Sequence, residues 1–229
     1  MDRRREPLVG KVVVRGEPGD DVFDTARHRA EATGLPSKSV DVRLTDIEWE
    51  LVHQLRLRGL VPAAGDPRYA RLIAIEIVLE KGTMFALSAA GRAAHASWAR
   101  FEAASASHAA VRLLHDGFED LNRELLAVCS AWQVTPAGAP NDHRDVEYDW
   151  EIIGRLERLH DRAAPRIRRA ARDASRFAQY DGLLRYALRM IVDEGQTEWF
   201  TSPRVDSYHT VWNRLHEDLL LALGLERTG

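Results

Sequence analysis

Residues 199–220 read Trp199-Phe-Thr-Ser-Pro-Arg-Val-Asp-Ser-Tyr-His-Thr-Val-Trp-Asn-Arg-Leu-His-Glu-Asp-Leu-Leu220. This stretch predicts a helix capped by Ser202, with Pro203 at the first helical position and Asp206 as an alternative start. Apolar side chains recur in it at intervals of four and three residues: Tyr208, Trp212, Leu215, Leu219 and Ala222. Because this interval follows the turn of an α-helix, we expect one face of the helix to be buried.

Polar residues run beside this apolar face. His209, Asn213 and His216 follow one another at the same helical spacing, and Asp206 and Glu217 lie at the edge of the row. A helix with two histidines next to its buried face either lines a pocket or closes a polar core. The sequence leaves both interpretations open.

The composition is that of a globular protein. The 229 residues are 45% hydrophobic and 29% charged, and the net charge is −3. Residues 1–100 hold 16 basic and 14 acidic side chains, against 16 and 21 in residues 101–229. A dedicated nucleic-acid-binding domain usually carries a clearer positive excess, so this balance neither supports nor excludes DNA as a partner.

Several features indicate a cytoplasmic protein without a membrane partner. The first residues are charged but lack the apolar core of a signal peptide, and no run approaches the roughly 20 apolar residues of a membrane helix. The lone cysteine, Cys129, occupies an apolar helical position, which favours a buried small side chain over a reactive thiol.

Residues 1–44 are expected to form an N-terminal extension with short strands at 12–14 and 40–44, and a helix at 23–33. Thr45-Asp-Ile-Glu48 is a capping box, which predicts a helix with Ile47, Leu51 and Leu55 on its apolar face. Gly59 ends this helix.

The next segment carries two conflicting signals. Asp66-Pro67 is typical of a helix start, whereas the isoleucines at 73, 75 and 77 alternate with other residues as in a strand. We expect a short helix that passes into a strand, then a turn at Lys81-Gly82 and a partner strand at residues 83–87.

From Ser88 onward every element is expected to be a helix: 88–114, 117–133, 145–175 with a break near Pro165, 180–194 and 203–223. The fold class is therefore mainly α, with a winged-helix-like N-terminal half that contains a β-hairpin and an all-helical C-terminal half. The expected domains are 1–44, 45–100 and 101–229.

Two motifs within residues 45–100 resemble those of MarR-type winged-helix regulators. They are Leu51-Val-His-Gln-Leu-Arg-Leu-Arg-Gly-Leu-Val61 before the hairpin and Leu87-Ser-Ala-Ala-Gly-Arg92 after it. More loosely, the C-terminal half resembles the helical tails of actinobacterial proteins described as such regulators. The resemblance implies transcription regulation, a homodimer and a small-molecule ligand held by the helical half.

The sequence departs from that pattern where the DNA-reading helix is expected. Residues 62–84 leave 23 positions for everything between the first helix and the second hairpin strand, and a recognition helix alone needs roughly 11. The basic residues that remain for DNA are Arg68, Arg71, Lys81 and Arg92. They suit phosphate contacts, which orient DNA without specifying its sequence.

The C-terminal half holds the candidate ligand and catalytic residues. The residues expected around a small-molecule ligand are Trp132, Asn141, Asp142, His143, Tyr208, Trp212 and Asn213. If the protein is an enzyme, His209 and His216 with Asp206 are the candidate acid–base groups. The alternative is that these polar residues tie the 134–145 loop to the last helix. No metal-binding motif is present, and no cofactor is expected.

A row of arginines follows one flank of the 145–175 segment: Arg155, Arg158, Arg162, Arg166, Arg169, Arg172 and Arg176. Guanidinium groups in such a row suit an anionic ligand. The alternative is a solvated face paired with Glu151, Glu157, Asp161 and Asp173.

These patterns support three hypotheses. The first is a winged-helix regulator that binds a small ligand. The second is an enzyme that evolved on a reduced winged-helix scaffold and acts on a small metabolite. The third is a non-catalytic module that binds a protein partner.

Overall fold

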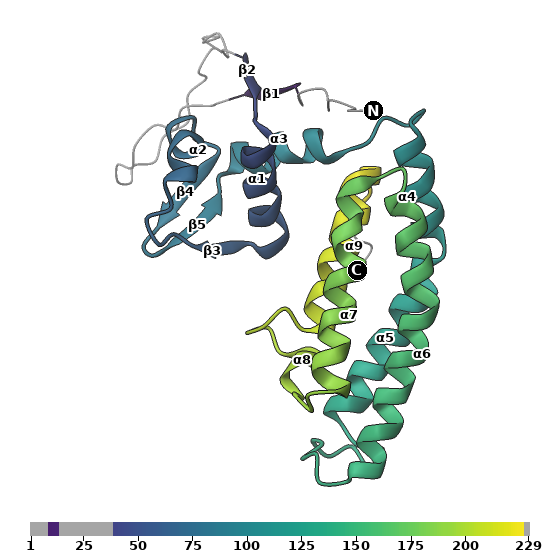
Figure 1. Ribbon diagram of the computed structural model, residues 1–229. Coiled ribbons are helices and arrows are strands. Elements are labelled where there is room, and N and C mark those ends of the chain that lie inside the picture. The colour runs from purple at the N-terminus through teal and green to yellow at the C-terminus, as the bar shows by residue number, and fades with distance from the viewer. Residues whose placement is uncertain (1–8, 14–38, 227–229) are drawn as a thin grey trace, which may run out of the picture. The chain divides into compact units, whose positions relative to one another are not determined.

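The computed structural model describes residues 9–13 and 39–226 of the chain (Figure 1). The protein is mainly helical, with a small three-stranded antiparallel sheet. It divides into two compact units, residues 1–99 and 100–229, called here the N-terminal unit and the helical unit. Among the described residues, no helix combines the length and the apolar character that crossing a membrane requires.

The N-terminal unit begins with β1 (Val9–Val13) and β2 (Ser39–Arg43), which pair antiparallel. The helix expected at 23–33 lies outside the described residues. Helix α1 (Asp46–Arg58) starts at the expected capping box, since the Glu48 N–H donates to Thr45 Oγ1 and the Thr45 N–H donates to Glu48 Oε2. Ile47 does not belong to the buried face, because it lies in the first turn and is 62% exposed.

The segment 66–80, whose sequence signals conflicted, forms a short helix followed by a strand. A 3-10 turn (Pro67–Tyr69) leads into α2 (Ala70–Ala74), and β4 (Val78–Lys81) follows. Glu76 separates them, because its positive φ of 58° ends the helical path and redirects the chain. The helical start predicted at Asp66-Pro67 is confirmed. The strand begins only at Val78, so the alternating isoleucines at 73, 75 and 77 precede it.

The sheet is completed by β3 (Leu60–Pro62) and β5 (Met84–Leu87), in the order β3-β5-β4. The expected β4–β5 hairpin turns at Gly82, whose φ is +60°. Helix α3 (Ala89–Ala99) then packs against α1 and β5. The core of this unit contains Leu51, Val52, Leu55, Tyr69, Leu72, Ile77, Phe85 and Trp98.

The helical unit contains α4 (Ala106–Asp116), α5 (Phe118–Gln133), α6 (Val146–Ala171), α7 (Ala178–Val192), α8 (Glu198–Thr201) and α9 (Tyr208–Leu223). Helix α6 packs against α4, α5 and α7, while α9 packs against α4, α7 and α8. The long helices lie side by side in Figure 1 and share one apolar core. Most of α9 is buried, which agrees with the apolar face expected for it.

The helices differ from those expected in three main ways. The predicted helix 88–114 is interrupted at residues 100–105, where the Phe101 N–H donates to the Ala222 carbonyl and Ser105 caps α4. Helix α6 is continuous through Pro165, which is exposed, so water can reach the carbonyl one turn earlier. The last helix is capped by Ser207, not by Ser202 or Asp206, and the short α8 precedes it.

Candidate functional site

The connection between α5 and α6 is an ordered loop of polar contacts. Val134 and Pro140 form an isolated antiparallel bridge, and the Thr135 N–H donates to the Ala139 carbonyl over 2.8 Å. Gly138 has a φ of +79°, which permits the tight reversal between them. The loop therefore returns to the end of α5, where the Asn141 N–H reaches the Gln133 carbonyl at 2.9 Å.

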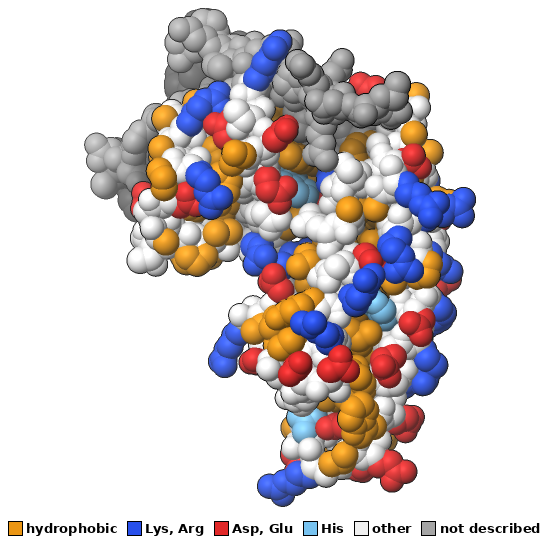
Figure 2. All heavy atoms as spheres, viewed as in Figure 1, with side chains coloured by type: hydrophobic (Ala, Val, Ile, Leu, Met, Phe, Trp, Pro, Cys, Tyr) orange, Lys and Arg blue, Asp and Glu red, His pale blue; other side chains and the backbone are white. Residues whose placement is uncertain are grey.

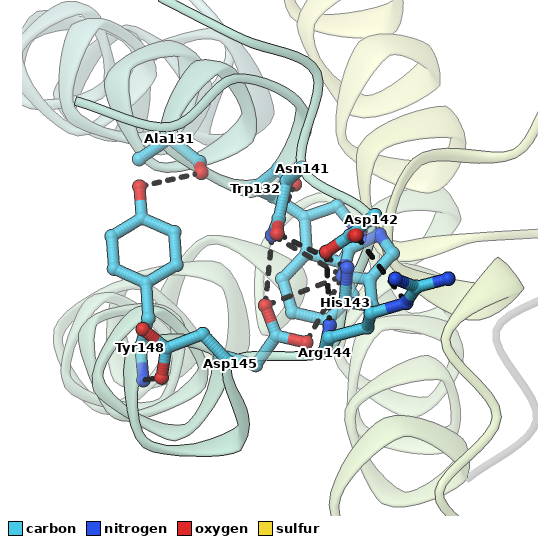
Figure 3. Close-up of polar contacts among 9 residues, drawn as sticks. Ala131, Trp132, Asn141, Asp142, His143, Arg144, Asp145 and Tyr148 are labelled. Carbon is cyan, nitrogen blue, oxygen red and sulfur yellow. Dashed lines mark hydrogen bonds and ion pairs between the residues drawn. The ribbon is translucent and has the colours of Figure 1, made fainter. Parts of the chain in front are cut away.

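Asn141 is the centre of this network, as Figure 3 shows. Its amide nitrogen lies 3.1 Å from the Trp132 carbonyl and 2.8 Å from Oδ1 of Asp149 on α6. Its side-chain oxygen accepts the His143 N–H at 3.1 Å. An asparagine amide has two hydrogens, and these two acceptors use both of them.

His143 and Asp149 form a carboxylate–imidazole pair. The Nδ1 atom of His143 lies 3.0 Å from Asp149 Oδ2 and 3.2 Å from Oδ1. The Asn141 amide nitrogen also lies 3.2 Å from this Nδ1. Since a carboxylate only accepts hydrogen bonds, we assign the hydrogen between His143 and Asp149 to Nδ1. In the neutral ring Nε2 then holds the lone pair, and it accepts hydrogen bonds or protons.

The His143 side chain is held in place and is still accessible. Its φ of 58° lies in the left-handed region, which histidine adopts more readily than most residues. The imidazole lies over the Trp132 ring at 4.4 Å, and Trp132 in turn stacks on Phe200 at 4.3 Å. The side chain remains 34% exposed, so solvent and small molecules can reach it.

The structure brings together only part of the expected ligand site. Trp132, Asn141 and His143 converge, whereas Asp142 points to Arg144, an exposed neighbour 3.4 Å away. Asp149, which completes the site, was missed by the sequence reasoning. Asp149 lies four residues after the helix cap Asp145, and this closeness to the loop is the feature of the sequence that could have indicated it.

Two of the remaining expected ligand residues belong to the packed interior, and the third, Asn213, is half-buried on α9. Tyr208 and Trp212 are buried, and the Trp212 indole stacks on Phe118 at 4.7 Å and donates to Asn122. The Tyr208 hydroxyl lies 3.2 Å from Nδ1 of His160 on α6. These aromatic side chains are therefore part of the core, and they do not line the Asn141–His143 site.

The acid–base set expected on α9 does not converge. His209 lies 3.2 Å from the Asn213 amide, His216 lies 3.1 Å from Glu119, and Asp206 pairs with Arg214. His209 and His216 are two helical turns apart, or about 10 Å along the axis. Burial also lowers the pKa of His209. The polar residues of α9 thus pair with separate partners, and none of these contacts reaches the 134–145 loop.

The expected DNA-contacting residues lie in the N-terminal unit, mostly with partners. Arg68 binds Asp66 at 2.6 Å, Arg71 binds Glu48 at 2.8 Å, and Arg92 donates to the Leu87 carbonyl. Lys81 is exposed at the end of β4 beside the hairpin turn. The salt bridge to Arg71 also affects Glu48: burial would raise its pKa, but the Thr45 N–H and Arg71 outweigh burial and lower it.

The arginine row of α6 has partners other than those expected. Arg162 pairs with Glu124 on α5, Arg166 donates to the Gly117 carbonyl, and Arg176 pairs with Asp218 on α9. Several of these arginines therefore connect α6 and the segment after it to neighbouring helices. We expected the arginines to pair with acidic residues of the same segment, and this was wrong for Arg162, Arg166 and Arg176.

Across residues 9–13 and 39–226, no cluster of three or more His, Cys, Asp and Glu side chains is arranged to hold a metal ion. Cys129 is buried, and burial raises the pKa of its thiol to about 12, as befits a core side chain. Comparison of the chain with family models, with curated proteins and with solved structures found no match.

Proposed function

We propose that this protein is a regulator of winged-helix type whose helical unit senses a small molecule. The observation that carries this proposal is the order of elements α1, β3, α2, β4, β5 and α3, with the strands arranged β3-β5-β4. That order resembles a winged-helix module with a hairpin wing, except that a complete module has two helices between α1 and the wing, where this chain has only the 3-10 turn and α2. The motifs at 51–61 and 87–92 carry the same resemblance.

The proposed DNA contact is made mainly to phosphates. The 3-10 turn and α2 together span eight residues, which is less than the three turns of a recognition helix. Arg68 and Arg71 are already bound by carboxylates, so Lys81 at the wing is the best-placed cation of the proposed set. Phosphate contacts position a duplex and carry little sequence information, so we propose weak sequence preference.

The proposed mechanism is linkage between ligand and DNA. A ligand that binds one arrangement of the helical unit more tightly changes the DNA affinity of the chain by the same free-energy coupling. The resemblance to winged-helix regulators also suggests a homodimer, which sedimentation velocity over a range of concentrations would test.

Fluorescence anisotropy with a labelled duplex tests the DNA contact. We expect affinity to fall between about 50 and 200 mM salt, and we expect Lys81→Gln to reduce the slope of log K against log salt by about 1. Arg144→Gln, an exposed substitution in the helical unit, is the matched control and should leave the slope unchanged. Absence of salt-dependent binding at micromolar protein would remove DNA from the proposal.

The His143–Asp149 pair favours a second candidate function, acid–base catalysis on a small molecule. The His143 imidazole is partly exposed and is oriented by the carboxylate of Asp149, the arrangement used by many general bases. Hydrolysis of p-nitrophenyl acetate provides a generic probe, and His143→Gln and Asp149→Asn should both reduce the rate. A wild-type rate no greater than that of free imidazole would exclude this candidate.

A further inference from the structure

The helical unit contains a groove between α4 and α6 that is separate from the His143 loop. Its volume is about 650 Å³, within the range of small-molecule sites. Apolar side chains provide most of its lining: Ala106, Ala109, Ala110, Leu113, Leu114 and Ala170. Leu113 is 57% exposed, so the groove presents an apolar surface to solvent.

Two contacts fix the ends of the groove. The Ser107 hydroxyl donates to the Asp173 carbonyl at one end, over 2.5 Å, and Arg166 donates to the Gly117 carbonyl at the other, over 2.9 Å. The two segments therefore run antiparallel along the groove. Alanines along the floor leave room between the helices that larger side chains would fill.

Arg169, in the last turn of α6, and Asp173, in the turn that follows the helix, both line the groove. Within the described parts of the chain, neither side chain makes a hydrogen bond or an ion pair. Arg169 and Asp173 thus give the groove a guanidinium and a carboxylate that are both available to a ligand.

The surroundings of Arg169 favour a carboxylate group on the ligand. Arg166 and Arg169 line the groove on the α6 side, Asp116 and Asp173 are its carboxylates, and Figure 2 shows basic side chains gathered over the upper part of α6. A guanidinium binds a carboxylate through two parallel hydrogen bonds. A ligand with a carboxylate alone would leave Asp173 close to a like charge, and an amine alone would face the arginines.

We propose that this groove binds a free α-amino acid with a large apolar side chain. Arg169 receives the carboxylate, Asp173 receives the ammonium group, and the side chain lies on the alanine floor against Leu113. The regulatory role of this amino acid rests on the proposed function, in which it is the molecule that the helical unit senses. The binding itself is independent of DNA.

Calorimetry with the full chain tests the ligand chemistry. L-Phenylalanine should bind saturably, and three analogues should each bind at least about tenfold more weakly, since each loses one contact. These are 3-phenylpropanoate without the ammonium, 2-phenylethylamine without the carboxylate, and glycine without the side chain. Equal binding of 3-phenylpropanoate and phenylalanine would overturn the proposal, and so would the absence of phenylalanine binding.

Two variants test the residues. Arg169→Gln and Asp173→Asn should each weaken phenylalanine binding at least about tenfold, while both retain the wild-type circular dichroism spectrum. Arg158→Gln removes an exposed arginine of α6 that does not line the groove, and it should bind as wild type does. Unchanged affinity in both groove variants would overturn the assignment.

The same samples separate this proposal from the regulatory function. If the chain binds DNA but not phenylalanine, the groove assignment fails and the regulator stands. If it binds phenylalanine but not DNA, the groove assignment stands and the DNA-binding regulator fails.

Discussion

Helix α9 and the 134–145 loop use similar residues in opposite ways. Both place histidine, asparagine and aspartate beside aromatic rings. In α9 the partners of Asp218 and His216 come from elsewhere in the chain: Arg176, Tyr180 and Glu119. In the loop the partners of Asn141 and His143 lie within about ten residues, and His143 stays accessible. Long-range pairing fixes the interior, while local pairing presents a side chain to solvent.

The strongest test of this contrast is Asp218→Ala. Asp218 is 0% exposed, its carboxylate lies 3.0 Å from Arg176, and it accepts the Tyr180 hydroxyl at 3.1 Å. Removal of one partner leaves a charge in a desolvated site, so we expect a loss of about 3–5 kcal/mol in the free energy of unfolding. Urea denaturation followed by circular dichroism measures it.

Asp193→Asn is the matched control, because Asp193 is exposed beyond the end of α7. It should change the unfolding free energy by less than about 0.5 kcal/mol. If Asp218→Ala gave a midpoint equal to that of the control, the buried pair would not stabilise the helical unit.

Asn141→Ala tests the loop, with a smaller expected effect. The variant loses the bonds to the Trp132 carbonyl, to Asp149 and to the His143 N–H, and Asp149 is nearly buried. We expect a loss of about 1–3 kcal/mol. Hydrogen-exchange mass spectrometry should show faster exchange in residues 134–149, with α9 little changed. Equal acceleration in both regions would contradict the local character of this network.

The comparison also explains which features the sequence predicts. The capping box at Thr45, the hairpin turn at Gly82 and the apolar face of α9 depend on residues close in the chain, and all three are present. These three predictions are confirmed because the interacting groups lie close together in the chain. Asn141 and His143 also contact each other, while their role in ligand binding stays a prediction.

Long-range partners could not be predicted in the same way. Nothing near Arg176 in the sequence indicates Asp218, and nothing near His216 indicates Glu119. The helix break at 100–105 likewise depends on Phe101 binding the carbonyl of Ala222. The contacts of His209, His216 and Asp206 could not be predicted for the same reason, since periodicity does not reveal the partners of these side chains.

The buried His160 makes the stability of the helical unit depend on pH. We expect this effect on the unfolding free energy to be smaller than those of Asp218→Ala and Asn141→Ala. Burial lowers the pKa of His160 below its ordinary value of 6.5, and nearby Asp181 and Asp161 offset only part of that shift. As the pH falls through about 6.5, the unfolded chain binds protons that the folded helical unit does not, so stability decreases. Thermal melts between pH 7 and pH 5 measure this, and His160→Gln should reduce the decrease. An unchanged pH dependence in His160→Gln would assign it to other groups.

His143→Gln should have the smallest effect on stability and the clearest effect on reactivity. The side chain is partly exposed, so we expect a change within about 0.5 kcal/mol in the free energy of unfolding. Diethyl pyrocarbonate acylates unprotonated imidazole nitrogens. The His143 side chain is 34% exposed, whereas His160 and His216 are buried. Peptide mapping should therefore find His143 modified faster than these two, and Asp149→Asn should alter that rate because it changes the partner of Nδ1. Accessibility is the property that separates the 134–145 loop from α9. If His216 reacted as fast as His143, this distinction would fail.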